Sequence, residues 1–249
     1  MDHIYNIIDN LEKENSDLMK VIIIGYTING TPLKVVQINP EQNNNSNFGI
    51  WIDGGTHARE WISISSILYI LNEIIHNREF LSINMKMTQF FIMPVLNPDG
   101  YRHSQNKERF WRKNRSKTFQ KNCIGVDLNR NWDFQWNETI TIENPCSETY
   151  KGLSPNSELE IKSVATFLQN NLKNIKGFVT FHSFGQKIIY PWAYNKSNVD
   201  DQFTLNNIGK LISQEILKKT LNIYTTGSAS LLLGRTQGKS KRYNSLTLI

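Results

Sequence analysis

The chain has 249 residues and a formal net charge of +6 at pH 7, and this length favours one large domain with a substantial core. No apolar run approaches the roughly 18–20 residues that cross a bilayer, so we expect no membrane-spanning helix. The basic residues are scattered and form no stripe interleaved with aromatic residues, so we expect no nucleic-acid partner.

Patterns typical of helices and strands alternate along the chain. Helical spacing of apolar residues predicts the helices, and short apolar runs bounded by turn residues predict the strands. In chain order we expect helix 3–13, strands 21–24, 33–38 and 48–53, helix 61–77, strand 89–95, an irregular loop 101–122, helix 159–172, strand 177–181, helix 203–219 and strand 221–226. This alternation predicts an α/β fold, in which helices cover both faces of a sheet. The polar and basic residues 234–249 show no periodicity, and we expect them to form a disordered tail.

Candidate metal ligands lie where two of the predicted strands end. His57 and Glu60 follow strand 48–53 at the entrance to a helix, and one imidazole and one carboxylate three residues apart can reach a single metal ion. Catalytic zinc sites use three protein ligands, so a second histidine is needed. His182 qualifies because it follows strand 177–181. Spacing alone leaves two other interpretations open, a surface pair at helical spacing and a structural histidine at a strand end.

Cysteine usage and the start of the chain say little about the compartment. Cys123 and Cys146 are either two free buried thiols or a disulfide pair. Residues 1–20 are charged and polar without an apolar core, so we expect no signal peptide in this chain. Several Asn-x-Ser/Thr sequons, which are weak indicators of secretion in an Asn-rich sequence, begin at Asn29, Asn114, Asn137 and Asn195.

Five sequence blocks together carry a resemblance to a known family. They are Asp53-Gly-Gly-Thr-His-Ala-Arg-Glu-Trp-Ile62, Pro94-Val-Leu-Asn-Pro-Asp-Gly-Tyr101, Phe110-Trp-Arg-Lys-Asn-Arg115, Gly125-Val-Asp-Leu-Asn-Arg-Asn-Trp-Asp133, and Thr180-Phe-His-Ser-Phe-Gly-Gln186 with Tyr190-Pro-Trp192. In this order they resemble the zinc metallocarboxypeptidases of the carboxypeptidase A/B type, over about residues 5–233. The resemblance implies a mixed eight-stranded sheet with helices on both faces. It also implies an incomplete catalytic domain over residues 1–233, which lacks the C-terminal part of the family's domain.

The resemblance assigns the metal site. His57, Glu60 and His182 match the ligands of one Zn²⁺ per chain, and carboxypeptidase A is itself the known example of this His₂Glu set. Asp127 matches the carboxylate that orients His57, since a metal-bound histidine usually donates its other N–H to such a partner.

The resemblance also assigns residues that bind the substrate. Asn129 and Arg130 match the pair that holds the terminal carboxylate of a peptide, for which a planar guanidinium offers two donors. Arg112 matches the arginine that stabilises the developing oxyanion. Arg59 matches a more remote substrate-binding arginine, and a solvated surface arginine is the alternative interpretation.

Further matches concern the neighbouring subsites and the cysteines. Ser183 and Phe184 stand where the family lines adjacent subsites, and Phe184 replaces the tyrosine that is usual in the vertebrate enzymes. Cys123 and Cys146 match a disulfide pair of the family, which implies an oxidising compartment and an extracellular location.

The resemblance ends near Leu233, before the family's general base. That base is a glutamate on a late strand, which takes a proton from water and passes it to the leaving amine. Residues 234–249 do not resemble the family's following segment, so we expect the base, a mobile tyrosine, the final strand and the closing helices to be absent. Three explanations remain open, namely a truncated or mis-spliced product of an active enzyme's gene, a short isoform that binds without hydrolysing, and a product that folds poorly.

The expected function is therefore a zinc-dependent metallocarboxypeptidase that removes C-terminal residues from peptides and proteins, and that is inactive if the base is missing. The alternative is a non-catalytic module that binds zinc and peptide C-termini, and a deacylase on a related scaffold is a weaker third possibility. We expect peptide or protein C-termini as partners and a monomeric chain.

Overall fold

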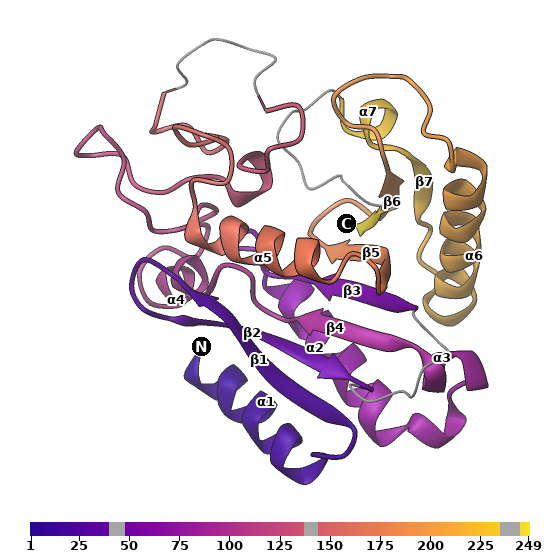
Figure 1. Cartoon of the computed structure of the whole chain (residues 1–249). Coiled ribbons are helices and arrows are strands. Elements are labelled where there is room, and N and C mark those ends of the chain that lie inside the picture. The colour runs from indigo at the N-terminus through magenta and orange to yellow at the C-terminus, as the bar shows by residue number, and fades with distance from the viewer. Residues whose placement is uncertain (40–47, 137–143, 235–244) are drawn as a thin grey trace.

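A mixed eight-stranded sheet forms the centre of the molecule (Figure 1). The computed structural model describes residues 1–39, 48–136, 144–234 and 245–249. The strands are β1 (Met19–Tyr26), β2 (Pro32–Ile38), β3 (Gly49–Asp53), β4 (Gln89–Met93), β5 (Ile175–Phe181), β6 (Lys187–Tyr190), β7 (Thr225–Ser228) and β8 (Ser245–Leu248). Their order across the sheet is β1-β2-β4-β3-β5-β8-β6-β7.

The central strands of the sheet are parallel. β4, β3, β5 and β8 run in one direction, β1 pairs antiparallel with β2 at one edge, and β6 pairs antiparallel with β8. In the register of β3 and β5, Asp53 lies opposite Thr180. Because both strands end at the same edge, the segments that follow Asp53 and Phe181 emerge side by side.

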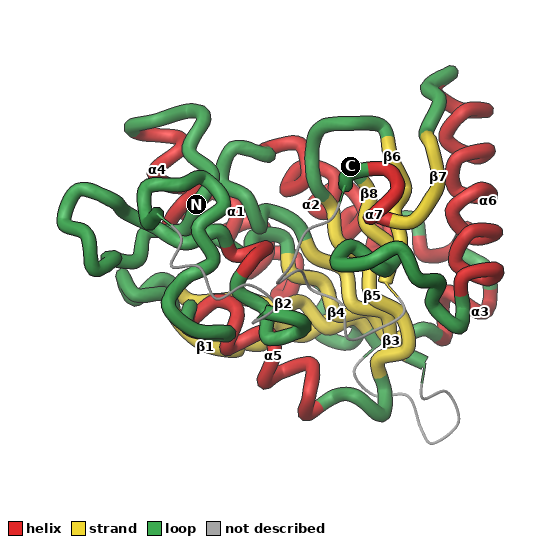
Figure 2. Tube along the Cα trace, turned by 90° about the horizontal axis from the view of Figure 1, so that it is seen from above, coloured by secondary structure: helices red, strands yellow, loops and turns green. Residues whose placement is uncertain are grey.

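Helices pack on both faces of the sheet, as the sequence predicted. The α-helices are α1 (Asp2–Glu14), α2 (Trp61–His76), α3 (Ile83–Met87), α4 (Pro98–Asn106), α5 (Leu159–Asn170), α6 (Gln202–Thr220) and α7 (Ala229–Leu232), and the 3₁₀ helices are η1 (Arg78–Phe80) and η2 (Leu128–Arg130). Figure 2 shows α2 and α5 on opposite sides of the twisted sheet. None of the helices in the described ranges combines the length and the apolar character that crossing a membrane requires.

Two apolar clusters hold these layers together. On one face Ile8 of α1 and Ile67 of α2 pack against Ile92 of β4, and all three side chains are fully buried. On the other face Ile161 of α5 packs in the same cluster as Trp51 of β3. Burial of each such side chain stabilises the folded state by roughly 1.5–3 kcal/mol relative to an exposed position. Packing on both faces therefore holds in place the sheet edge where the parallel strands end.

The polar segment after β4 is more ordered than expected. We predicted an irregular loop over residues 101–122, but the helix α4 begins at Pro98 and continues to Asn106. The Asn97 side chain caps this helix by accepting a hydrogen bond of 2.9 Å from the Gly100 backbone N–H. Proline at the first position and a capping Asn are strong helix-start signals, which the low apolar content of the segment obscured.

The predicted disordered tail is wrong for its last residues. Ser245–Leu248 form β8, which inserts between β5 and β6, and residues 235–244 lie outside the described residues. Leu246 is buried in a cluster with Ile188 and Leu205. The expected absence of a late strand is therefore wrong as well.

Candidate metal centre

A tight glycine turn positions the first two candidate ligands. After β3 the chain turns through Gly54 and Gly55, and Gly55 has a φ of +64°. A Cβ on Gly54 would lie 2.9 Å from the Ile67 side chain and 3.0 Å from the Ser63 carbonyl oxygen, so the turn packs directly on α2. The Gly55 N–H also donates a hydrogen bond of 3.0 Å to Ser63 Oγ. These contacts fix the loop that carries His57 and Glu60.

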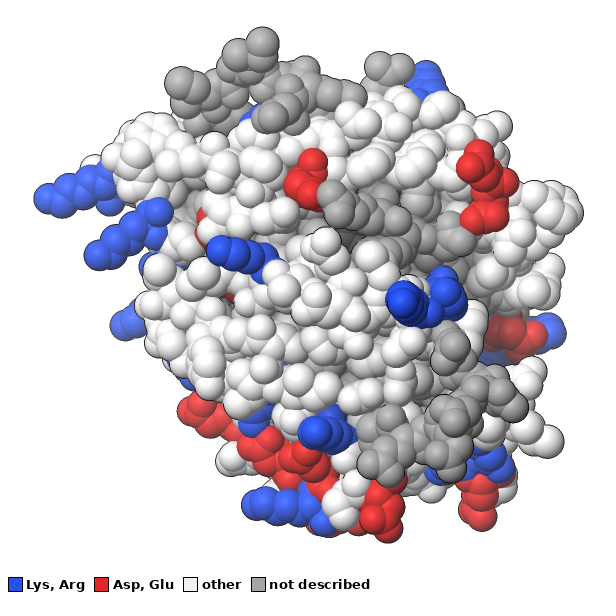
Figure 3. Space-filling model, viewed as in Figure 1, with Lys and Arg blue, Asp and Glu red and all other residues white. Residues whose placement is uncertain are grey.

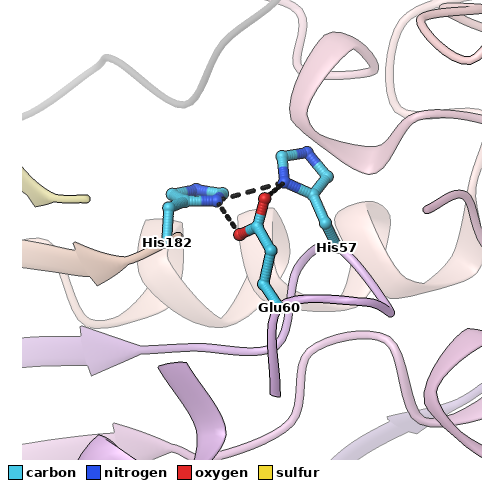
Figure 4. Close-up of side chains that lie close together, drawn as sticks. All are labelled: His57, Glu60 and His182. Atoms are coloured by element: carbon cyan, nitrogen blue, oxygen red, sulfur yellow. Dashed lines mark hydrogen bonds and ion pairs between the residues drawn. The ribbon is translucent and has the colours of Figure 1, made fainter. Parts of the chain in front are cut away.

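Three side chains converge at the edge of the sheet (Figure 4). Glu60 Oε1 lies 2.7 Å from His57 Nδ1, and Glu60 Oε2 lies 2.8 Å from His182 Nδ1. The two Nδ1 atoms are 3.2 Å apart. Ligand atoms about 2.0–2.2 Å from a tetrahedral zinc ion lie roughly 3.3 Å from one another, so this donor set fits such an ion.

The pKa values of Glu60 and His182 are both shifted below their ordinary values. Burial alone would raise the pKa of Glu60, but His57 and His182 together outweigh it and hold that pKa well below the ordinary value. Burial lowers the pKa of His182, which Glu60 opposes. An ionised carboxylate and a neutral imidazole are the forms that coordinate a metal.

A second, fully buried carboxylate backs the cluster. Asp127 Oδ1 lies 3.2 Å from His57 Nε2, so the ring nitrogen that faces away from Glu60 is engaged. Asp127 Oδ2 accepts hydrogen bonds from Arg112 Nε at 3.2 Å and Nη2 at 2.9 Å. Burial would raise the pKa of Asp127, but His57 and Arg112 hold it well below its ordinary value.

Three residues that the resemblance matched to substrate binding, Arg112, Asn129 and Arg130, lie at the rim of this cluster. Arg112 Nη1 is 4.0 Å from Glu60 Oε1, and the side chain is largely buried. Asn129 Nδ2 is 3.5 Å from His182 Nε2. Arg130 Nη1 donates a hydrogen bond of 2.9 Å to the Asn129 carbonyl oxygen and is 3.9 Å from Asp127 Oδ2. The 3₁₀ helix η2 thus places the Asn129–Arg130 pair beside the second imidazole.

The remaining predicted site residues differ in their distance from the cluster. The Ser183 backbone N–H donates a hydrogen bond of 3.2 Å to Glu60 Oε2. Phe184 is 96% exposed and projects from the loop after β5. Arg59 is partly exposed and bonds to Glu148 Oε2 at 3.2 Å and to the Phe110 carbonyl oxygen at 3.3 Å. Among the described residues, the Arg59 side chain makes these two contacts and no hydrogen bond or ion pair with the three candidate ligands.

The two cysteines form the disulfide that the resemblance implied. Cys123 and Cys146 are bonded, with their Cα atoms 4.7 Å apart. The loop that they close contains η2 and therefore both Asn129 and Arg130. This cross-link therefore restrains the segment that lies beside the candidate metal centre.

Comparison with protein families gives a direct match. The family model described as zinc carboxypeptidase matches residues 4–248. The chain belongs to the zinc carboxypeptidase family. Zinc carboxypeptidases depend on zinc, and the cluster of His57, Glu60 and His182 supplies a donor set that could hold it.

Individual zinc carboxypeptidases are similar over most of this chain. Carboxypeptidase B2 of Rattus norvegicus is 37% identical over 240 residues, and carboxypeptidase A2 of Mus musculus is 34% identical over 243 residues. These alignments cover 94% and 96% of this chain, and the chain spans about 57% of the length of both relatives. The solved structure of bovine thrombin-activatable fibrinolysis inhibitor in complex with tick carboxypeptidase inhibitor is 34% identical, with a TM-score of 0.89 over 99% of this chain and 84% of that chain.

The zinc carboxypeptidase match continues beyond the point where the sequence resemblance ended, because it includes β8. The His182 backbone N–H donates a hydrogen bond of 2.7 Å to the Leu248 carbonyl oxygen. Phe181 pairs with Leu248 in the parallel register of β5 and β8, so the next residue, Ile249, lies beside His182. Leu246 and Leu248, spaced two apart in a polar segment, were the signal that could have revealed this strand.

Proposed function

We propose that this chain is a zinc-dependent metallocarboxypeptidase that hydrolyses the C-terminal peptide bond of peptides and proteins. One observation carries the proposal, namely that the Asn129–Arg130 segment lies beside the His57–Glu60–His182 cluster, with Asn129 Nδ2 3.5 Å from His182 Nε2. A peptide whose end is held by this segment would have its last peptide bond close to the three donors.

The metal centre in this proposal uses residues of the chain in two roles. His57, Glu60 and His182 hold one zinc ion, which when bound lowers the pKa of a coordinated water and polarises a carbonyl. Asp127 receives the other ring N–H of His57 and so orients the imidazole. Both roles agree with the burial of these four side chains.

The substrate end is recognised through its carboxylate. Arg130 offers a planar guanidinium and Asn129 an amide, and together they can donate several hydrogen bonds to one carboxylate. An internal peptide bond presents no carboxylate at this place, so the pair restricts the reaction to chain ends.

Arg112 stabilises negative charge on the scissile carbonyl oxygen. Its Nε and Nη2 are fixed by Asp127, and its Nη1 lies 4.0 Å from Glu60 Oε1, toward the metal centre. A guanidinium that is fixed in advance needs no reorganisation as charge develops, which is the condition for effective oxyanion stabilisation.

Ser183, Phe184 and Arg59 contact more distant parts of a peptide. The exposed ring of Phe184 is next to Ser183, which is anchored to Glu60. Arg59 lies farther out, where the Glu148 carboxylate holds it. These positions suit residues upstream of the scissile bond.

We further propose an extracellular, monomeric protein whose partners are peptide or protein C-termini. The Cys123–Cys146 disulfide supports an oxidising compartment. On the face in Figure 3 the basic side chains are scattered among acidic and uncharged ones, which gives no support to a nucleic-acid surface.

A second candidate function is a module that binds zinc and peptide C-termini without hydrolysis. Among the described residues, the carboxylates that bond to the three candidate ligands are Glu60 itself and Asp127, and both are engaged. The residue beside His182 is Ile249, which directly follows β8 and cannot transfer a proton. General acid–base catalysis contributes roughly 10²–10⁴-fold, so such a site would bind far better than it turns over.

Turnover separates the two candidates. The full chain is supplied with zinc and an N-blocked dipeptide that has a free carboxylate, and the same dipeptide as its C-terminal amide serves as control. A metallocarboxypeptidase hydrolyses the free acid only, and His57→Ala abolishes the reaction. Turnover equal to that of His57→Ala would exclude hydrolysis by this chain.

Binding tests the recognition that both candidates share. Calorimetry with the same free-acid peptide should show binding that Arg130→Ala weakens by about 10- to 100-fold, the effect of losing charge-assisted hydrogen bonds. Arg102→Ala, at a surface arginine that pairs with Asp2, is the matched control. Binding that Arg130→Ala leaves unchanged would remove the proposed clamp. A wild type that binds the peptide without turnover would lack a general base. In that case Ile249→Glu should produce hydrolysis, provided that the base belongs directly after β8.

A further inference from the structure

The sequence contains more glycosylation sequons than its fold can accept. Asn-x-Ser/Thr occurs at five asparagines, of which Asn44 and Asn137 lie outside the described residues. An attached oligosaccharide is large and strongly hydrated, so in a folded protein it must project into solvent. The surroundings of Asn29, Asn114 and Asn195 therefore decide which of these three can carry one.

Asn114 is excluded by burial. Its side chain has no exposed surface, and its Nδ2 donates hydrogen bonds to Ser116 Oγ at 3.0 Å and to Glu158 Oε2 at 2.7 Å. Its Oδ1 accepts a hydrogen bond of 2.8 Å from the Val126 backbone N–H. A sugar on this nitrogen would have to occupy the protein interior, so a chain modified at Asn114 could not reach this fold.

Both polar side chains of the Asn29 sequon, those of Asn29 and Thr31, donate hydrogen bonds to one carboxylate. Its Nδ2 donates a hydrogen bond of 2.9 Å to Asp99 Oδ2, and the Thr31 hydroxyl donates one of 2.7 Å to Asp99 Oδ1. Asp99 and Thr31 are both buried. Asn29 itself is exposed, so burial does not exclude it. A sugar on its Nδ2 would instead stand next to the buried Asp99 carboxylate and crowd the contact between the β1–β2 turn and α4.

Asn195 is half-buried, but among the described residues its amide oxygen is engaged and not its amide nitrogen. Its Oδ1 accepts hydrogen bonds from the Ser197 backbone N–H at 3.1 Å and from the Ser197 hydroxyl at 2.6 Å. Within the described ranges, Asn195 Nδ2 makes no hydrogen bond, and the three following residues, Lys196 to Asn198, are exposed. The preceding Tyr194 packs its ring against Phe134 and Trp192, with centroids 5.5 Å away in both cases, and so anchors the segment.

We propose that Asn195 is an N-glycosylation site, and that of these three sequons it is the one occupied in the native protein. The amide nitrogen of Asn195 forms a bond to the anomeric carbon of an oligosaccharide carried on a lipid diphosphate. The carbon–oxygen bond to the diphosphate breaks, the lipid diphosphate leaves with the electron pair, and Nδ2 loses one proton. The inference rests on the extracellular location proposed above and is independent of peptidase activity.

The test uses the full chain, expressed in insect cells with an export signal placed ahead of Met1. Peptide mapping after treatment with a peptide N-glycosidase, which converts a glycosylated asparagine to aspartate, should find aspartate at position 195 and asparagine at 29 and 114. Asn195→Gln and Ser197→Ala should each remove one glycan from the intact protein, and Ser197→Thr should keep it. Asn198→Gln is the matched control, because it changes an exposed neighbour without touching the sequon.

Each outcome bears on the proposal. Unmodified asparagine at 195 in secreted wild-type protein overturns it, as does a glycan at Asn114 in protein with a native circular dichroism spectrum. If the substituted chains fail to accumulate, the wild-type peptide map decides alone. A chain that stays inside the cell with a glycan at Asn195 contradicts the proposed location and leaves the site itself supported.

Discussion

Asp127 and Arg112 form a two-donor contact in which Arg112 Nε and Nη2 both bond to Asp127 Oδ2. The other oxygen, Oδ1, faces His57 Nε2 and the Asn129 backbone N–H. One buried carboxylate therefore sets the orientation of a candidate metal ligand, of the proposed oxyanion arginine and of the segment that bears the proposed clamp.

Asp127→Asn should weaken zinc binding about 10- to 100-fold, the usual cost of losing a carboxylate partner of a metal-bound histidine. The amide keeps the shape of the side chain but loses the charge that Arg112 and His57 face. Competition with a chelating dye at fixed pH measures the affinity. Asp99→Asn, at a buried carboxylate that bonds to Asn29 and Thr31, is the control. Equal affinities for the two variants would argue against an orienting role for Asp127.

His182→Ala should reduce the bound zinc from about one ion per chain to almost none, because catalytic zinc requires three protein ligands. Elemental analysis of dialysed protein gives the ratio. His76→Ala changes an exposed histidine whose Nδ1 contacts the Asn72 carbonyl of its own helix, and it should keep the full zinc content. Retention of stoichiometric zinc in His182→Ala would refute the ligand assignment.

Removal of the metal should also lower thermal stability. A ligand that binds the folded state alone stabilises it by mass action, so a chelator should lower the unfolding midpoint of the wild type. The same chelator should leave the midpoint of His182→Ala unchanged. A midpoint that falls equally in both proteins would mean that the chelator acts elsewhere.

Stability should fall as pH rises toward neutrality because of Glu160. Burial raises the pKa of this carboxyl from 4.5 to about 7, while its own backbone N–H and Asn114 oppose the rise. A raised folded-state pKa means that the folded chain holds the proton more tightly. The stabilisation is complete below pH 4.5 and is lost as pH passes through about 7.

Glu160→Gln mimics the neutral form and should remove this pH dependence, which amounts to roughly 3 kcal/mol at most. Urea unfolding at several pH values between 4 and 8 measures it, with the exposed Glu14→Gln as control. Wild-type and Glu160→Gln free energies that stay parallel over this range would contradict the assignment.

Loss of the disulfide should destabilise the chain by about 3 kcal/mol, since the two cysteines are 23 positions apart and the unfolded loop gains freedom. The variant carries Cys123→Ser together with Cys146→Ser, and denaturant unfolding measures the change. Zinc content should be retained, because none of the three ligands lies in the loop. Loss of zinc along with stability would mean that the cross-link is part of the metal centre.

Much of the fold could be predicted from local patterns. α2 follows from buried residues at helical spacing, among them Ile64, Ile67 and Leu71. The errors fall where polar residues dominate. Residues 98–106 have too few apolar positions to reveal a helix, and β8 has two leucines whose partners, Ile188 and Leu205, are distant in the sequence.

The site was predictable only in part for a similar reason. The spacing of His57 and Glu60 and the place of His182 after a strand were compatible with a metal, but also with a surface pair and a structural histidine. The family resemblance was needed to favour the metal. The convergence of these donors depends on the register that places Asp53 beside Thr180, a long-range pairing that no local pattern encodes.

The hydrogen bond from the His182 backbone N–H to the Leu248 carbonyl oxygen links the candidate metal centre to β8. A polypeptide that stopped before Ser245 would still contain His57, Glu60 and His182, yet the backbone amide of its second imidazole ligand would lose its partner in the sheet. Docking of β8 therefore completes the backbone support of the segment that carries His182. A polypeptide without β8 should accordingly hold zinc less tightly than the full chain.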